Sequence, residues 1–214
     1  MIRAAAILLA AGRSRRLGRP KPLLPWGEGT LIAYQIAELA AVGCQPIIVV
    51  LGHEAGAVLP HLDHPSVEAI INPRYEEGRA SSLRAGAQSV PADAEAVVIL
   101  SVDQPRPRDA LRRLLAEHER GGALITQPEH RGHRGHPVVV SARLLPELRQ
   151  ATDETLGLRA VLRAHADRTR LVPFDDPVVT VDLNTPGDVE RARPLFGLPK
   201  EGGPGDRREA PGLQ

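Results

Sequence analysis

Two short segments of the chain combine charged side chains with glycine or proline in a way that suits a polyanion and a metal ion. The segment Gly12–Lys21 (GRSRRLGRPK) holds two glycines, a serine and several cations. Backbone N–H groups of such a loop can point at phosphate oxygens, whose charge Arg16 and Lys21 could neutralise. Asp103 follows an apolar run, and carboxylate oxygens are ligands that Mg²⁺ prefers. These residue types are compatible with a phosphate site and an accompanying cation, and equally with a solvated basic loop and a capping aspartate.

Apolar runs that read as buried strands must position these residues. Residues 4–9, 46–51, 67–71 and 96–102 form such runs without polar alternation, and helical patterns at 31–42, 80–89 and 109–120 separate them. This order predicts an α/β chain with a doubly wound, mostly parallel sheet and helices on both faces. Because open α/β sheets bind ligands at the carboxyl ends of their strands, Asp103 is expected at the binding edge.

The last third of the chain has a less regular pattern. We expect strands at 124–126, 138–140, 171–174 and 178–181, and helices at 144–150, 156–165 and 186–195. From residue 199 the sequence is rich in Gly, Pro and charge and has no periodicity. We predict one domain over residues 1–197 and a disordered tail over residues 198–214.

Composition and charge exclude several classes of protein. Among 214 residues, 27 Lys and Arg face 26 Asp and Glu, and there are only two Phe, two Tyr and one Trp. This balance argues against nucleic-acid binding. No later apolar run reaches the roughly 18 residues that span a bilayer, and the apolar start of the chain runs into basic residues instead of a cleavage site. The single Cys44 has no partner for an internal disulfide. We therefore expect a cytoplasmic protein without membrane contact.

The loop after the first run matches neither common phosphate fingerprint. In a Walker A loop a Ser or Thr follows the lysine, whereas Pro22 follows Lys21. In the GxGxxG pattern a second glycine would stand at Ser14, which also disfavours a Rossmann oxidoreductase. From these residues alone, a solvated basic loop and a phosphate-binding loop are about equally consistent with the sequence.

The full spacing of the segment, LAAGxSxRxGxxKxLL over residues 9–24, resembles the signature loop of the MobA-like nucleotidyltransferases. These are Rossmann-like enzymes that attach nucleotides to molybdopterin. The resemblance implies that the signature backbone contacts base and triphosphate, and that the arginine and the lysine hold phosphates. The residues that it assigns to the nucleotide are Leu9, Ala10, Ala11, Gly12, Ser14, Arg16 and Lys21.

Two acidic motifs extend the resemblance. Asp103-Gln104-Pro105 resembles the family motif DQP, whose aspartate binds the metal, although Asp103 alone could also cap a turn. The segment from Asp182 to Asp188 resembles D-x-D/N-T-P-x-D, which implies that Asp182 approaches the same Mg²⁺ and that Asn184 is a weaker candidate. Thr185 and Pro186 read as a helix cap followed by the first helical residue. The catalytic residues are thus expected to be Arg16, Lys21 and Asp103.

Two further segments resemble regions that border the ligands in this family. In residues 72–86 the resemblance points to Asn72, Gly78, Ser81 and Ser82 as nucleotide contacts, although Ser82 could equally be a plain helix residue. In GHRGHP it points to Arg134, Gly135 and His136 as acceptor neighbours. A zinc site at the two histidines is disfavoured, because zinc needs three or four protein ligands.

The resemblance implies a Mg²⁺-dependent transfer of CMP from CTP to a molybdopterin-type acceptor. Family members that use CTP tend to read LAAG and those that use GTP LAGG, and the methyl group of Ala11 would crowd the base pocket. Use of GTP or of a sugar-phosphate acceptor stays open. So does a catalytically silent module that delivers the cofactor, and a molybdoenzyme client or its chaperone is a further possible partner.

Overall fold

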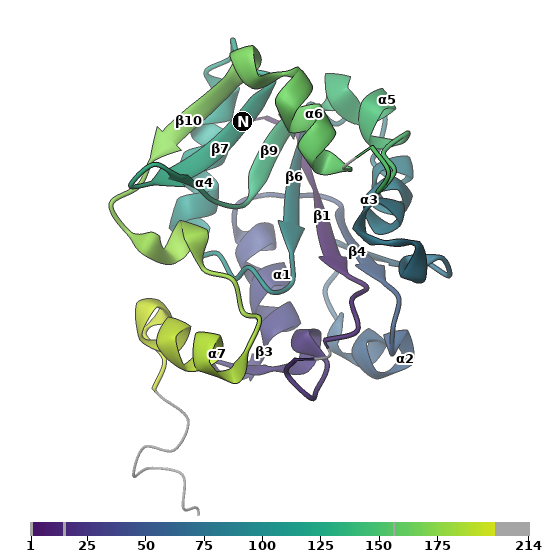
Figure 1. Cartoon of the computed structure of the whole chain (residues 1–214), viewed down its shortest axis with the longest axis vertical. Coiled ribbons are helices and arrows are strands. Elements are labelled where there is room, and N and C mark those ends of the chain that lie inside the picture. The colour runs from purple at the N-terminus through teal and green to yellow at the C-terminus, as the bar shows by residue number, and fades with distance from the viewer. Residues whose placement is uncertain (1, 15, 156, 200–214) are drawn as a thin grey trace, which may run out of the picture.

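A computed structural model describes residues 2–14, 16–155 and 157–199 of the chain. Its centre is an eight-stranded sheet in the order β10-β7-β9-β6-β1-β4-β5, with β8 paired to β7 (Figure 1). The strands are β1 (Ala4–Ala10), β4 (Ile47–Leu51), β5 (Val67–Ile71), β6 (Ala96–Ser101), β7 (Ile125–His130), β8 (His133–Arg134), β9 (Val138–Ser141) and β10 (Thr169–Pro173), beside a small pair β2 (Pro25–Trp26) and β3 (Gly29–Thr30). Only β8 and β9 run antiparallel to their neighbours in the main sheet, which confirms the predicted mostly parallel sheet.

Helices cover both faces of this sheet (Figure 1). Along β1, Ala6 and Leu8 belong to the apolar cluster that includes α1, α4 and α7, whereas Ile7 and Leu9 belong to the cluster of α3, α5 and α6. The strand is apolar throughout because both of its faces are buried. The helices are α1 (Leu31–Ala41), α2 (Ala55–Val58), α3 (Arg79–Gln88), α4 (Arg108–Glu119), α5 (Leu145–Leu148), α6 (Leu158–Ala164) and α7 (Pro186–Ala192).

Short 3₁₀ helices connect many of these elements, and one of them replaces a predicted strand. They are η1 (Lys21–Leu23), η2 (Leu59–His61), η3 (Tyr75–Glu77), η4 (Ala142–Leu144), η5 (Ala166–Arg168), η6 (Pro177–Thr180) and η7 (Arg193–Phe196). The prediction of a strand at 178–181 is wrong. The side chain of Asp176 accepts a hydrogen bond from the Val178 N–H (2.8 Å) and Pro177 follows it in the first helical turn. This local cap outweighs the strand preference of the two valines.

The C-terminal part of the described chain contains α7 and then η7. The hydroxyl of Thr185 accepts a hydrogen bond from the Asp188 N–H, the Asp188 carboxylate accepts one from the Thr185 N–H, and Pro186 takes the first helical turn. The predicted cap is therefore confirmed. Of the predicted tail, Leu198 still donates its N–H to the Arg193 carbonyl (2.9 Å), and residues 200–214 lie outside the described part. Within the described residues, no helix has the length and apolar character to span a membrane.

Candidate active site

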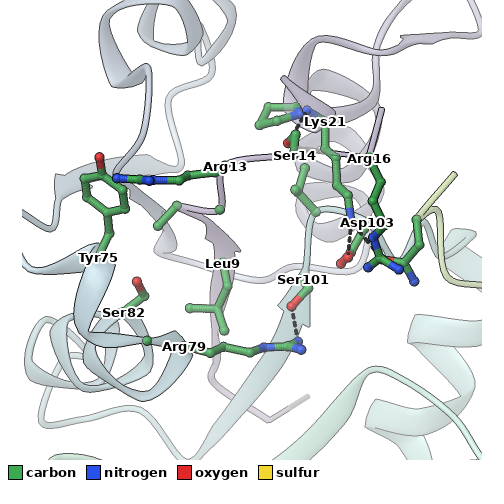
Figure 2. Close-up of a pocket in the computed structure, with 16 residues that line it drawn as sticks. Leu9, Arg13, Ser14, Arg16, Lys21, Tyr75, Arg79, Ser82, Ser101 and Asp103 are labelled. Atoms are coloured by element: carbon green, nitrogen blue, oxygen red, sulfur yellow. Dashed lines mark hydrogen bonds and ion pairs between the residues drawn. The ribbon is translucent and has the colours of Figure 1, made fainter. Parts of the chain in front are cut away.

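A cavity of about 430 Å³ lies at the carboxyl ends of β1 and β6 (Figure 2). This is the edge at which open α/β sheets bind ligands, and the volume suits a small molecule. The predicted site residues that line it are Leu9, Ala11, Gly12, Ser14, Arg16, Lys21, Gly78, Ser82 and Asp103. Ala10 does not line it, because its side chain alternates to the opposite face of β1 and packs in the cluster of α1.

Lys21 joins three of the predicted segments inside this cavity. Its Nζ donates to Asp103 Oδ2 (2.7 Å) and to Asn184 Oδ1 (3.0 Å), and Arg16 Nη2 donates to the same amide oxygen (3.2 Å). The side chains of Lys21 and Asp103 are only 15% and 23% exposed. Two cations and one carboxylate therefore converge on one wall, which can hold a strongly anionic group.

Ser14 shapes the loop that carries these cations. Its φ of 49° lies in the left-handed region that few residues other than glycine adopt. Its hydroxyl accepts a hydrogen bond from the Lys21 N–H (2.9 Å), and its carbonyl accepts one from Leu17 (3.0 Å). The loop is thus folded back on itself, so that the start of η1 lies beside the end of β1.

The amino end of α3 forms the opposite wall. Gly78 has a φ of 117°, and a Cβ at this position would lie 2.0 Å from Asp153 Oδ2. That carboxylate accepts a hydrogen bond from the Ala80 N–H (3.1 Å) and caps the helix. The backbone conformation therefore favours glycine here, and a larger residue would also displace the capping carboxylate of Asp153.

Asn72 supports this wall without lining the cavity. Its amide Nδ2 donates to the hydroxyls of Ser81 (2.9 Å) and Ser82 (3.0 Å), and its Oδ1 accepts from the Arg74 N–H (3.0 Å). The side chain is buried and all of these contacts are internal. Among these residues, only Ser82 reaches the cavity, so any effect of Asn72 on a ligand passes through that hydroxyl.

The backbone segment of Asp182 lies beside that of Asp103 in the fold, but Asp182 does not line the cavity. The N–H of Leu183 donates to the Asp103 carbonyl (2.8 Å), which aligns the two segments. The buried side chain of Gln104 donates to Asp182 Oδ1 (2.8 Å). Both aspartates keep one carboxylate oxygen for which no hydrogen bond is found within the described residues.

Arg106, which no sequence motif singled out, ties the three loops of this region together. Its guanidinium donates to the carbonyls of His136 (2.6 Å), Pro105 (2.6 Å) and Val181 (3.0 Å). The side chain is fully buried. Burial lowers the pKa of Arg106 to about 9, while the charges of Asp182 and Asp103 act in the opposite direction. It remains a cation at neutral pH and links the positions after β6, before β9 and before α7.

The structure does not bring Arg134, Gly135 and His136 into the cavity lining. Arg134 is exposed on β8. Gly135 is buried, and a Cβ there would lie 2.2 Å from the Val179 carbonyl oxygen, which in turn accepts the His136 N–H (2.9 Å). Burial and the cations Arg106 and Arg79 lower the pKa of His136 to about 4, so its ring is neutral at pH 7. The acceptor role of these three residues stays a prediction.

Further charged and aromatic side chains reach the cavity without having been predicted. Arg13 forms an ion pair with Glu76 and lies 5.9 Å from the ring centre of Tyr75, so that it spans the mouth between the loop and η3 (Figure 2). Arg79 crosses the cavity below Leu9 and donates to the hydroxyl of Ser101. Both arginines stand inside the segments that carry the resemblance, but these contacts join residues that are distant in the chain.

No group of three or more His, Cys, Asp or Glu that could enclose a metal exists among the residues with described positions. A cation here would rely on Asp103 and Asp182 together with oxygens of its ligand and of water, the arrangement that Mg²⁺ commonly adopts.

Comparison with known proteins agrees with this geometry. Residues 6–169 match the model of the MobA-like NTP transferase domain. Nicotine blue oxidoreductase of Paenarthrobacter nicotinovorans is 32% identical over 186 residues, which cover 84% of this chain and 91% of that protein. Molybdenum cofactor cytidylyltransferase of Escherichia coli strain K12 is 28% identical over 191 residues, which cover 89% and 95%.

A solved structure extends the likeness to three dimensions. Rv0371c of Mycobacterium tuberculosis H37Rv, crystallised in complex with manganese, superposes with a TM-score of 0.72 at 25% identity, over 89% of this chain and 97% of that one. The family match spans most of the sheet and includes the loop and the aspartate that meet in the cavity. The chain therefore belongs to the MobA-like NTP transferase family of nucleotidyltransferase enzymes.

Proposed function

We propose that this nucleotidyltransferase transfers CMP from CTP to the phosphate of a molybdopterin-type acceptor, with Mg²⁺, and releases pyrophosphate. The observation that supports it most is the contact of Lys21 with Asp103, because it joins a phosphate-binding loop and a candidate metal ligand in one cavity. The cytidylyltransferase of Escherichia coli, 28% identical over nearly its whole length, supports the choice of substrates.

Arg16 and Lys21 are the residues that bind the triphosphate. Both donate to Asn184 Oδ1, so their charged ends are held at one place. Negative charge grows on the bridging oxygen and on the pyrophosphate as this group leaves. Cations that are already in position stabilise that charge without reorganisation.

Asp103 and Asp182 are the residues that would hold Mg²⁺. Their adjacent backbones and the two carboxylate oxygens left without a described hydrogen bond fit a hard cation that also needs ligand and water oxygens. When bound, the ion neutralises charge on the triphosphate. The manganese complex of Rv0371c agrees with a divalent cation in this fold.

The chemistry needs little covalent participation by the protein. An oxygen of the acceptor phosphate forms a bond to the α-phosphorus of CTP, and the bond from that phosphorus to the bridging oxygen breaks. The acceptor phosphate is ionised at neutral pH, so no strong general base is required. Positioning and charge stabilisation then provide most of the rate acceleration.

Base selection is assigned to the wall formed by Ala11. This residue lines the cavity, and a Cβ on Gly52 would lie 2.9 Å from the Ala11 methyl and 2.6 Å from Tyr75. The methyl group therefore stands in a packed environment that cannot easily yield. A smaller pyrimidine suits this wall better than a purine does.

A second candidate is an oxidoreductase, which the 32% identity with nicotine blue oxidoreductase favours. Such an activity would require a hydride donor that binds in the same cavity. The two functions are separable, because only the transferase consumes a nucleoside triphosphate.

The experiment that tests the proposal incubates the purified protein with Mg²⁺, molybdopterin and one of CTP, GTP, ATP or UTP, and measures pyrophosphate. Acceptor-dependent release with CTP is expected. Release with GTP alone would contradict the base assignment. In a parallel incubation with a reduced nicotinamide and a reducible quinonoid dye, hydride transfer to the dye without any pyrophosphate release in the first assay would favour the oxidoreductase. Nucleotide binding without turnover of any substrate would indicate the silent delivery module.

A further inference from the structure

Arg79 is a cation that crosses the cavity from the wall opposite Lys21. It is the first residue of α3 and lines the cavity. Figure 2 shows its side chain extending below Leu9 until the guanidinium meets the Ser101 hydroxyl. Ser101 ends β6, two residues before Asp103. The end of this strand is thus approached by Lys21 at Asp103 and by Arg79 at Ser101.

The charge of Arg79 has no carboxylate partner within the described part of the chain. Its described hydrogen bond is to a neutral hydroxyl. The neighbouring arginines differ in this respect, since Arg74 and Arg84 pair with Glu77 and Arg13 pairs with Glu76. A guanidinium that faces a cavity without a carboxylate is suited to bind an anion bidentately.

The position of Arg79 separates this anion site from the triphosphate loop. Arg16 and Lys21 converge on Asn184, whereas Arg79 enters from the opposite wall and places its guanidinium lower on the same strand end, at Ser101 (Figure 2). The positive charge of Arg79 also helps to lower the pKa of His136, which stands in the loop before β9. Two anionic groups could therefore occupy the cavity at once, with the reacting phosphorus between them.

We propose that Arg79 binds the phosphate monoester of the acceptor and directs its oxygen at the α-phosphorus of the nucleotide. The inference rests on the proposed function and makes Arg79 a specificity residue for phosphorylated acceptors. The acceptor oxygen forms the new bond to phosphorus, pyrophosphate leaves with the electrons of the broken bond, and the guanidinium stays bound to the remaining acceptor oxygens.

The test compares wild-type protein with Arg79→Met and Arg79→Lys. Arg74→Met is the matched control, because Arg74 is an exposed arginine of the same segment whose side chain contacts only Glu77 among its described partners. Pyrophosphate release is measured at saturating CTP and Mg²⁺ with molybdopterin varied, and then with CTP varied. We expect the acceptor KM of Arg79→Met to rise about 10- to 100-fold, the loss typical of one charged hydrogen-bonding group. The KM of Arg79→Met for CTP should stay within about 2-fold of the wild-type value. The acceptor KM of Arg79→Lys should lie between those of the wild type and Arg79→Met.

An equilibrium measurement keeps this inference separate from the proposed function. Calorimetry first measures binding of α,β-methylene-CTP with Mg²⁺, and then binding of inorganic phosphate to the protein saturated with that analogue. Arg79→Met should bind the analogue as the wild type does and lose the phosphate. If wild-type protein fails to bind the analogue, the proposed function is wrong.

Two results would overturn the assignment of Arg79 while leaving the transferase function intact. In the first, Arg79→Met weakens binding of the CTP analogue as much as it weakens binding of the acceptor. That result would mean that the guanidinium contacts the nucleotide. In the second, Arg79→Met changes neither the acceptor KM nor phosphate binding. Equal melting temperatures of the variants show that the comparison concerns folded protein.

Discussion

At the scale of single residues, the cavity is lined by a few charged side chains that neutralise one another. Lys21 and Asp103 form a contact of 2.7 Å in which each side chain is less than one quarter exposed. Solvent screens such a pair incompletely, so removal of one partner leaves the other charge poorly compensated. The same two groups are the proposed phosphate and metal ligands. Their variants should therefore lower both activity and stability, so activity is compared between variants shown to be folded.

The first prediction concerns Asp103. Replacement by Asn or Ala should lower kcat/KM for CTP by about 10²- to 10³-fold, as is typical when one preorganised charged group is lost. Steady-state pyrophosphate release measures the effect, and Asp93→Asn serves as a control because Asp93 is exposed and pairs with Arg3 elsewhere. If Asp103→Asn keeps wild-type activity over a range of Mg²⁺ concentrations, the aspartate is no metal ligand.

The second prediction concerns His136, whose pKa burial and nearby cations lower to about 4. Since the unfolded ring titrates near 6.5, the unfolded state binds more protons than the folded state between pH 6.5 and 4. The histidine therefore causes no loss of stability above pH 6.5, and destabilises the fold progressively as pH falls toward 4. The full effect is on the order of 3 kcal/mol.

Urea unfolding at several pH values measures this dependence. His136→Asn should lose less unfolding free energy than the wild type does between pH 6.5 and 4.5. Parallel curves for the two proteins would show that the ring is accessible and titrates normally.

At the scale of elements, contacts between residues distant in the chain hold the loops at one edge of the sheet in place. Gly135 and η6 touch so closely that a Cβ on Gly135 would lie 2.2 Å from the Val179 carbonyl oxygen. Arg106 then bridges from Pro105 to both loops. Val178 and Val179, which we predicted to form a strand, lie in the 3₁₀ helix η6 instead, because Asp176 and Pro177 initiate a helical turn before them. The carbonyl of Val179 then packs against Gly135.

The third prediction follows from this close packing. Gly135→Ala should destabilise the fold by about 1–3 kcal/mol, the usual cost of overpacking, since the clash is with rigid backbone. Gly56→Ala is the matched control, because Gly56 lies in α2 and a Cβ added there would meet nothing within 4 Å. Chemical denaturation compares the two variants. Equal stability of both would mean that η6 can move away at little cost.

At the scale of the whole molecule, the strand order brings together positions that are far apart in the chain. β1 lies between β4 and β6, so the loop after β1 meets the segment after β6. The C-terminal segment joins them through a hydrogen bond from the Leu183 N–H to the Asp103 carbonyl (2.8 Å). A ligand that touches all of these segments would stabilise the complete fold, since unfolding would break every contact at once.

The fourth prediction is a nucleotide-dependent rise in melting temperature. CTP with Mg²⁺ at 100 times its Kd should stabilise the protein by about 2.7 kcal/mol, or about 5–10 °C for a domain of this size. Thermal unfolding is recorded with CTP, with GTP and with chelator in place of Mg²⁺. Chelator should remove most of the shift, and Asp103→Ala should show little of it. A shift that is independent of Mg²⁺ would argue against the metal assignment.

The sequence by itself determined the fold class and the family to which the signature of residues 9–24 belongs. Continuous apolar runs indicate strands buried on both faces, and a spacing such as that of residues 9–24 is local, so it needs no tertiary information. The cap at Thr185 was likewise predictable, because it depends on adjacent residues. Local patterns of this kind survive folding when no distant contact opposes them.

Only the tertiary structure decided which side chains meet. Arg79 reaches Ser101 and Arg106 reaches Val181 across 22 and 75 positions of the chain. These contacts depend on the order of the strands and on the distances between loops, which no local spacing encodes. The same holds for two other motif residues, since Ala10 packs in the core and Asn72 is buried behind the cavity wall. Motifs identify candidate site residues, whereas packing of the sheet and its helices decides which of them line the cavity.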